Sequence, residues 1–154
     1  MANEQQANNL PVSFYFSISL TGAHITADAS FQEVSGISVE LDMEEISEGG
    51  ENKFNYKMPA HAKYSNLVLK HGIVAANSDF AAWCIKSVGS DFSKPVMPKT
   101  LTLFLLNESG DKLMSWDFIN AYPVEWSISD LKSQDNSLVI ESVEFAYNYF
   151  TRIS

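Results

Sequence analysis

The sequence contains a single cysteine, Cys84, and therefore cannot form a disulfide bond within the chain. This cysteine usage favours folding in a reducing compartment. Positive charge is scarce, because 10 Lys and Arg stand against 19 Asp and Glu and leave a net charge of −9. Such a chain lacks the basic face that binding to nucleic acid or to anionic lipid requires. The most apolar run, LTLFLL at Leu101 to Leu106, is far too short to span a bilayer.

Patterns for catalysis and metal binding are also missing. His24, His61 and His71 are scattered without metal-ligand spacing, and there is no GxSxG, P-loop or GxGxxG motif. Acidic residues could supply a carboxylate pair for a glycan-active enzyme, but Glu44 and Glu45 are neighbours on a predicted strand and point to opposite faces. We therefore predict that the protein is not an enzyme and binds no metal or cofactor.

The chain of 154 residues, 45% hydrophobic, is long enough to bury one sizeable core. We predict a single domain over residues 1–154, in which the polar residues 1–10, MANEQQANNL, form a loose N-terminal arm. These ten residues show no signal-peptide pattern, so we expect no export signal there.

Strict alternation of apolar and polar residues predicts strands in the first half of the chain. The segment VSFYFSISL alternates over residues 12–20, and GISVELDME alternates over residues 36–44. In the second segment Val39, Leu41 and Met43 share one face, and the opposite face is wholly polar. A further strand, KFNYKM, with Phe54, Tyr56 and Met58 on its apolar side, is expected to end at Pro59.

The second half predicts one helix among further strands. A short apolar strand, or a loop leading into one, is expected at residues 66–73, and a helix at 78–88 with Ser78 as its N-cap. A hairpin is expected over residues 100–118, with its turn at 108–111, followed by strands at 124–130 and at 137–150. The last strand carries Glu141 on an otherwise apolar face. These elements predict an all-β fold of barrel-like, packed antiparallel sheets with one flanking α-helix.

Charge is sorted along the chain. Residues 27–52 contain eight acids and no Lys or Arg, whereas residues 53–78 contain four Lys and no acid. In one account, acids and lysines oppose each other across an intramolecular hairpin. In another, they pair between subunits in a head-to-tail contact that closes into rings or extends into filaments. Composition alone does not choose between the two.

Three segments carry a family resemblance: EISEGGENKFNYKMP, KYSNLVLKHG and WDFINAYPVEWSISDLKSQDNSLVIESVEFAYNYF. From about Phe14 to Phe150, the chain resembles the inner tube protein of contractile injection systems, the phage tail tube family. The resemblance implies a structural protein that forms hexameric rings stacked into a hollow tube, driven through a target envelope when a surrounding sheath contracts. The implied partners are other copies of the chain, sheath protein, baseplate, spike and tube-terminating proteins, and possible protein cargo in the lumen. Assembly is expected in the bacterial cytoplasm, as part of a released or cell-anchored particle.

Two groups of residues acquire expected roles from this resemblance. The polar strand face is expected to line a wet lumen, through Ser38, Glu40, Asp42 and Glu44. A contact loop is expected to reach neighbouring subunits, through Glu48, Gly49, Gly50, Glu51, Asn52, Lys53, Lys57 and Lys63. Pairing of acids and lysines across subunits would then account for the charge sorting.

Two alternatives stay open at this point. The first is a monomeric small-ligand-binding β-barrel, with a cavity lined by Phe14, Phe16, Tyr147 and Tyr149. The second stays within the family and is the tube of a secretion system whose subunit is itself exported as an effector carrier.

Overall fold

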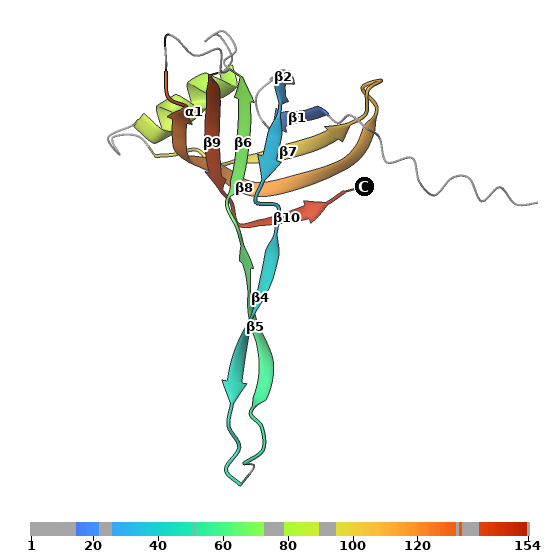
Figure 1. Cartoon of the computed structure of the whole chain (residues 1–154), viewed down its shortest axis with the longest axis vertical. Coiled ribbons are helices and arrows are strands. Elements are labelled where there is room, and N and C mark those ends of the chain that lie inside the picture. The colour runs from blue at the N-terminus through green and yellow to red at the C-terminus, as the bar shows by residue number, and fades with distance from the viewer. Residues whose placement is uncertain are drawn as a thin grey trace, which may run out of the picture.

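The computed structural model describes residues 15–21, 26–50, 52–72, 79–89, 95–131, 133 and 139–153. In chain order its elements are β1 (Tyr15–Leu20), β2 (Thr26–Phe31), β3 (Glu33–Ser35), β4 (Val39–Ile46), β5 (Tyr56–Tyr64), β6 (Leu67–Gly72), α1 (Asp79–Gly89), β7 (Lys99–Leu106), β8 (Lys112–Ile128), β9 (Ile140–Ala146) and β10 (Tyr149–Arg152). The predicted N-terminal arm, Phe14 and the N-cap Ser78 lie outside the described residues. Figure 1 shows a body of curved strands with one helix, from which a long two-stranded arm projects.

The body is one 8-stranded sheet, ordered β2-β1-β7-β8-β9-β6-β3, with β10 paired to β8. Every strand pair in it is antiparallel. The two ends of this order, β2 and β3, are consecutive in the chain and separated only by Gln32, whose N–H donates to the Lys70 carbonyl at 2.9 Å. The sheet therefore curls until its ends approach each other, and the prediction of a barrel-like antiparallel fold with one helix is confirmed.

The long strand β8 turns the corner of this body. Its first half pairs with β7 and β10, with Trp116 opposite Leu103 and Phe118 opposite Phe150, whereas its second half pairs with β9. Between the halves, Asn120 has a positive φ of 53°, a conformation that asparagine tolerates better than most residues. We predicted separate strands at 112–118 and 124–130; the structure has one continuous strand because the backbone bends without leaving the sheet.

The hydrophobic core lies between the curled sheet and α1. Its buried members are Ile18, Leu20, Phe31, Leu67, Leu69, Phe80, Cys84, Leu101, Leu103, Phe118, Ala121, Val143 and Phe145. On the inner side of α1, the Trp83 ring stacks on Phe145 with centroids 6.0 Å apart. Burial, followed by the charge of Glu141, raises the pKa of the Cys84 thiol to about 12, so this cysteine is a core residue and not a nucleophile. Among the described helices, none is long and apolar enough to cross a membrane.

Glu141, the exception on its strand face, is buried in the core. Its Oε1 accepts a hydrogen bond from the Trp126 indole N–H at 2.5 Å, and its Oε2 lies 3.4 Å from His71 Nε2. The His71 ring in turn meets Phe31 edge-on, with centroids 5.1 Å apart. A buried carboxylate is tolerated when it is hydrogen-bonded, so this network joins β6, β8 and β9 through polar contacts.

Three other strand assignments differ from the sequence predictions. Pro59 does not end its strand: β5 continues to Tyr64, because each strand of a two-stranded ribbon has a free edge where a missing N–H costs no ladder bond. The predicted strand at 137–150 divides into β9 and β10, since the chain crosses to the other half of β8 after Ala146. Strand β2 was not predicted, although its sequence TADASF alternates between polar and apolar residues, because Ala and Asp are poor strand formers. The turn after β7 is confirmed, with the Asn107 side chain accepting from the backbone N–H groups of Ser109 and Asp111.

Replacing Glu141 with Ala should lower the free energy of unfolding by about 2–4 kcal/mol, because it removes the acceptor for Trp126 and the partner of His71 inside the core. Urea unfolding followed by tryptophan fluorescence measures this loss. The matched control is Glu125→Ala on the neighbouring strand, where the side chain is exposed and the change should stay within about 0.5 kcal/mol. Equal effects from both variants would contradict the network.

Candidate assembly arm

The arm is a separate two-stranded sheet formed by β4 and β5. Figure 1 shows it extending away from the body, with its strands crossing as they twist. It is also the segment in which the predicted lumen residues and the predicted contact loop lie. Since a two-stranded ribbon is at best marginally stable alone in water, a projecting arm of this length calls for packing against another surface.

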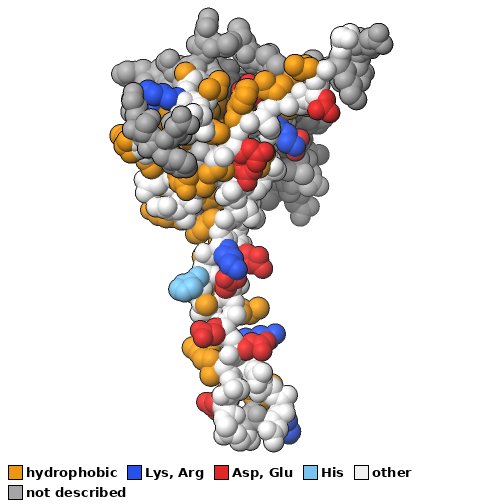
Figure 2. Space-filling model, turned by 90° about the vertical axis from the view of Figure 1, so that its left-hand side faces the viewer, with side chains coloured by type: hydrophobic (Ala, Val, Ile, Leu, Met, Phe, Trp, Pro, Cys, Tyr) orange, Lys and Arg blue, Asp and Glu red, His pale blue; other side chains and the backbone are white. Residues whose placement is uncertain are grey.

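The apolar face of β4 is exposed to solvent in the single subunit. Val39, Leu41 and Met43 share this face and are 53%, 54% and 64% exposed. The sequence predicted correctly that these residues share one side of the strand, but their own core does not cover them. Apolar side chains recur along the arm in the space-filling view (Figure 2). A contiguous apolar strand face left in solvent marks an interaction surface.

Partway along the arm, a β-bulge changes which residues of β4 and β5 share a face. Leu41 lies opposite Ala62, whereas Met43 lies opposite Pro59, so β5 contributes one more residue than β4 between these pairs. Beyond the bulge Glu44 lies opposite Met58, and directly opposed residues point to the same face. Met58 therefore shares a face with Glu44, so the apolar side predicted for the second strand falls on the acidic side of β4 beyond this point.

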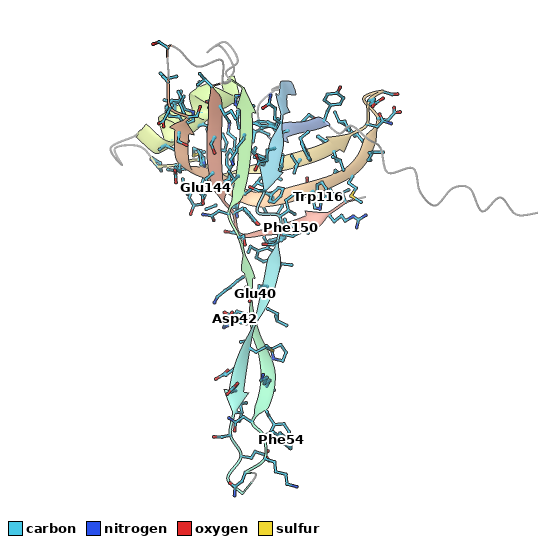
Figure 3. All side chains as sticks on the ribbon, viewed as in Figure 1. Glu40, Asp42, Phe54, Trp116, Glu144 and Phe150 are labelled. Carbon is cyan, nitrogen blue, oxygen red and sulfur yellow. The ribbon has the colours of Figure 1, made fainter. Side chains whose placement is uncertain are left out.

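The acidic face of β4 carries Glu40, Asp42 and Glu44. Lys63 lies opposite Glu40 in the register, and its Nζ contacts Asp42 Oδ2 at 2.9 Å. The hydrogen bond and the charge of Asp42, with a smaller contribution from Glu40, raise the pKa of Lys63. Figure 3 shows Glu40 and Asp42 on the half of the arm nearer the body. Lys57 likewise lies opposite Glu45, so opposition of acids and lysines across an intramolecular hairpin explains part of the charge sorting.

The predicted contact loop lies at the far end of the arm. Glu48, Gly49, Gly50, Asn52 and Lys53 follow the end of β4, and Glu51 lies outside the described residues. Apart from the chain neighbours, no atom of the described residues lies within 4 Å of a Cβ placed on Gly49 or Gly50.

An aromatic pair supports the return strand beyond this loop. The Phe54 and Tyr56 rings meet edge-on, with centroids 5.2 Å apart. Figure 3 places Phe54 near the tip. Lys63 lies instead near the base, paired to its own chain. The predicted contact residues are thus spread along the arm, from the tip through Lys57, opposite Glu45, to Lys63 nearer the body.

The base of the arm is fixed by close backbone packing. Gly36, with φ of +88°, lies so close to the next strand connection that an added Cβ would be 1.9 Å from the Asn66 carbonyl oxygen. Ser38 Oγ and Ser65 Oγ are 2.7 Å apart, and Asn66 Nδ2 donates to Glu144 Oε1 at 2.9 Å. Ser38, predicted to line a lumen, therefore lies at the junction between arm and body.

Neither metal-binding nor catalytic geometry emerges from the described part of the chain. Within it, no group of three or more His, Cys, Asp or Glu side chains could hold a metal ion. Of the described aromatic residues in the ligand-barrel alternative, Phe16 and Tyr147 pack against the core and Tyr149 is exposed.

A curled antiparallel body with an exposed apolar arm defines a structural protein that assembles with other chains. Residues 12–151 match the T4-like virus tail tube protein gp19 family. The chain belongs to this family, and is therefore a structural tube component and not an enzyme. Comparison with curated proteins finds no match.

Solved structures agree with this assignment. A chain of the anti-feeding prophage (AFP) baseplate is 26% identical, with a TM-score of 0.76 over 91% of each chain. A chain of an extracellular contractile injection system, the PVC sheath–tube complex in the extended state, is 22% identical, with a TM-score of 0.73 over 100% of this chain and 99% of that one. A chain of the PVC sheath/tube terminator is 22% identical, with a TM-score of 0.72 over 96% and 98%. The resemblance to the tube proteins of contractile injection systems is confirmed.

Gly36→Ala should destabilise the subunit by about 2–4 kcal/mol, because alanine strains a left-handed backbone and its Cβ collides with the carbonyl of Asn66. The matched control is Gly49→Ala at the tip, where φ is not positive and the space is open. It should change stability by less than about 0.5 kcal/mol. Thermal unfolding of both variants compares them; a Gly36 variant as stable as wild type would refute the close approach at the base.

Proposed function

We propose that the chain forms hexameric rings that stack into the hollow inner tube of a contractile, phage-tail-like injection particle. Contraction of a surrounding sheath then drives this tube through a target envelope. The observation that carries the proposal is the arm, whose apolar face of Val39, Leu41 and Met43 is uncovered in the single subunit. Membership of the tail tube family supports the proposal.

The arm requires a partner for a physical reason. Three apolar side chains more than half exposed carry an unfavourable free energy of hydration, which falls when a neighbouring subunit covers them. We propose that the arm packs on a different surface of the neighbouring subunit, which makes the contact heterologous. A heterologous contact repeated by rotation closes into a ring, and repeated along an axis it extends into a filament. A stacked-ring tube satisfies both.

The structures that contain related chains also support a choice of partners for this subunit. The related chains come from structures described as a baseplate, a sheath–tube complex and a sheath/tube terminator. We accordingly propose sheath, baseplate and spike, and tube-terminating proteins as partners of this subunit. Synthesis and assembly in the bacterial cytoplasm, before the particle is released or anchored to the cell, agree with the single buried cysteine.

The acidic face of the arm is proposed to line the lumen, through Ser38, Glu40, Asp42 and Glu44. The ion pair to Lys63 neutralises Asp42 within the subunit, which leaves Glu40 and Glu44 to set much of the charge on this face. A lumen of this kind repels polyanions and attracts basic protein cargo weakly.

Charge repulsion must be offset when rings stack. Six copies at −9 each give −54 per ring. We propose that the tip, from Glu48 to Lys53, together with Lys57, forms charge pairs with neighbouring subunits, while Lys63 keeps its partner in its own chain. Salt screens both the repulsion and these exposed pairs, so stacking is expected to depend on ionic strength.

Met43→Glu should abolish tube formation while the subunit stays folded, because it places a charge on the apolar face of the arm. Negative-stain electron microscopy and sedimentation at two salt concentrations measure assembly, and wild type should give rings or hollow tubes whose population shifts with salt. The control is Met97→Glu, a methionine of similar exposure (67% against 64%) on the loop before β7, with the same net charge. Normal tubes from the Met43 variant would refute the docking role of the arm.

Removing the lumen carboxylates tests their assignment separately. Tubes of the double variant Glu40→Gln, Glu44→Gln should retain a basic test protein less strongly than wild-type tubes do, by roughly twofold to tenfold at low salt. The measurement is co-sedimentation of the tubes with a small basic protein and, for comparison, with an acidic protein of similar size. Unchanged retention of the basic protein would place these carboxylates outside the lumen.

A further inference from the structure

A cluster of aromatic side chains lies where the arm meets the body. Tyr64, the last residue of β5, meets Phe150 and Tyr147 with ring centroids 5.4 and 6.0 Å away. Tyr147 also meets Phe118, a fully buried core residue, at 4.9 Å and nearly edge-on. Figure 3 shows Phe150 at the lower side of the body, beside the start of the arm. The base of the arm is therefore packed against the core itself.

Tyr147 also makes a polar contact with the segment at the base of the arm. Its hydroxyl donates to the backbone carbonyl of Ser65 at 2.7 Å, and Ser65 directly follows β5. Partial burial, followed by the nearby Tyr64, raises the pKa of Tyr147, so the hydroxyl keeps its proton at neutral pH. A short, well-formed bond from a rigid ring to the backbone fixes both distance and direction.

The position of Tyr147 in the chain explains how this contact can fix the arm relative to the body. It lies between β9 and β10, where the chain crosses from one half of β8 to the other. The next residue, Asn148, donates its N–H to the Ile119 carbonyl at 2.9 Å, beside the bend at Asn120. Tyr147 is thus anchored at the corner of the sheet.

We propose that Tyr147 is a positioning residue for assembly: through its hydroxyl bond to Ser65 and its ring contacts with Tyr64 and Phe118, it locks the angle between arm and body. Each subunit then presents its apolar arm face to the next copy in one orientation. This inference rests on the proposed function. A preset arm avoids part of the ordering entropy that docking otherwise costs, so the lock lowers the concentration at which subunits assemble.

Tyr147→Phe tests the lock with little change in packing, and Tyr149→Phe, two residues away and exposed, is the matched control. In the isolated subunit, hydrogen exchange of the arm amides in β4 and β5 should be about fivefold faster for Tyr147→Phe, as loss of one hydrogen bond predicts. The critical concentration for tube formation should rise by a similar factor. The control should match wild type in both measurements.

Ser65→Ala separates the two contacts of Ser65, because it removes the hydroxyl near Ser38 and keeps the carbonyl that accepts from Tyr147. Its arm exchange should stay closer to wild type than that of Tyr147→Phe. Unchanged arm exchange in Tyr147→Phe would overturn the lock. Faster exchange with unchanged assembly would overturn its role in presenting the arm. If the wild-type chain forms no tubes, the proposed function fails, and the exchange measurement on the subunit still decides whether the lock exists.

Discussion

The central constraint on this structure is an exposed apolar surface, the face of β4 that the subunit's own core does not cover. The body buries its hydrophobic side chains in the usual way, between a curled sheet and a helix. The arm instead places Val39, Leu41 and Met43 in solvent on a ribbon that has only one partner strand. Such a ribbon gains stability mainly by packing against another surface. Contacts with other subunits are therefore expected to supply part of the free energy that stabilises the arm.

The body supplies a rigid base for this arm. Strand β8 joins both halves of the sheet through the bend at Asn120, and the buried contacts of Glu141 hold β9 against β6 and β8. Close packing at Gly36 and the aromatic contacts of Tyr147 connect the base of the arm to this corner. The base of the arm is therefore connected directly to the core of the fold.

Alternation along the chain predicted most of the strands and the polar and apolar faces of β4, and the capping pattern at Ser78 predicted the helix α1. Alternation did not predict that the apolar face of β4 stays exposed, because period-two patterning gives which residues share a face and not what covers that face. Nor could it locate the bulge opposite Asp42, which moves Met58 to the acidic face, since a one-residue slip in register leaves each strand's own pattern unchanged. The Asp42–Lys63 pair depends on the same register, and composition left that pairing open. The family resemblance, carried by specific segments, identified the class of protein.

The most direct test of the account is oxidative footprinting of the native methionines, read by mass spectrometry, in isolated subunits and in assembled particles. Met43 on the apolar face of the arm is 64% exposed in the subunit and supplies a reporter without mutation. The account predicts that Met43 is oxidised readily in the subunit and is protected severalfold on assembly. Equal oxidation of Met43 in both states would show that the arm face stays in solvent, and would contradict the claim that a neighbouring subunit covers it.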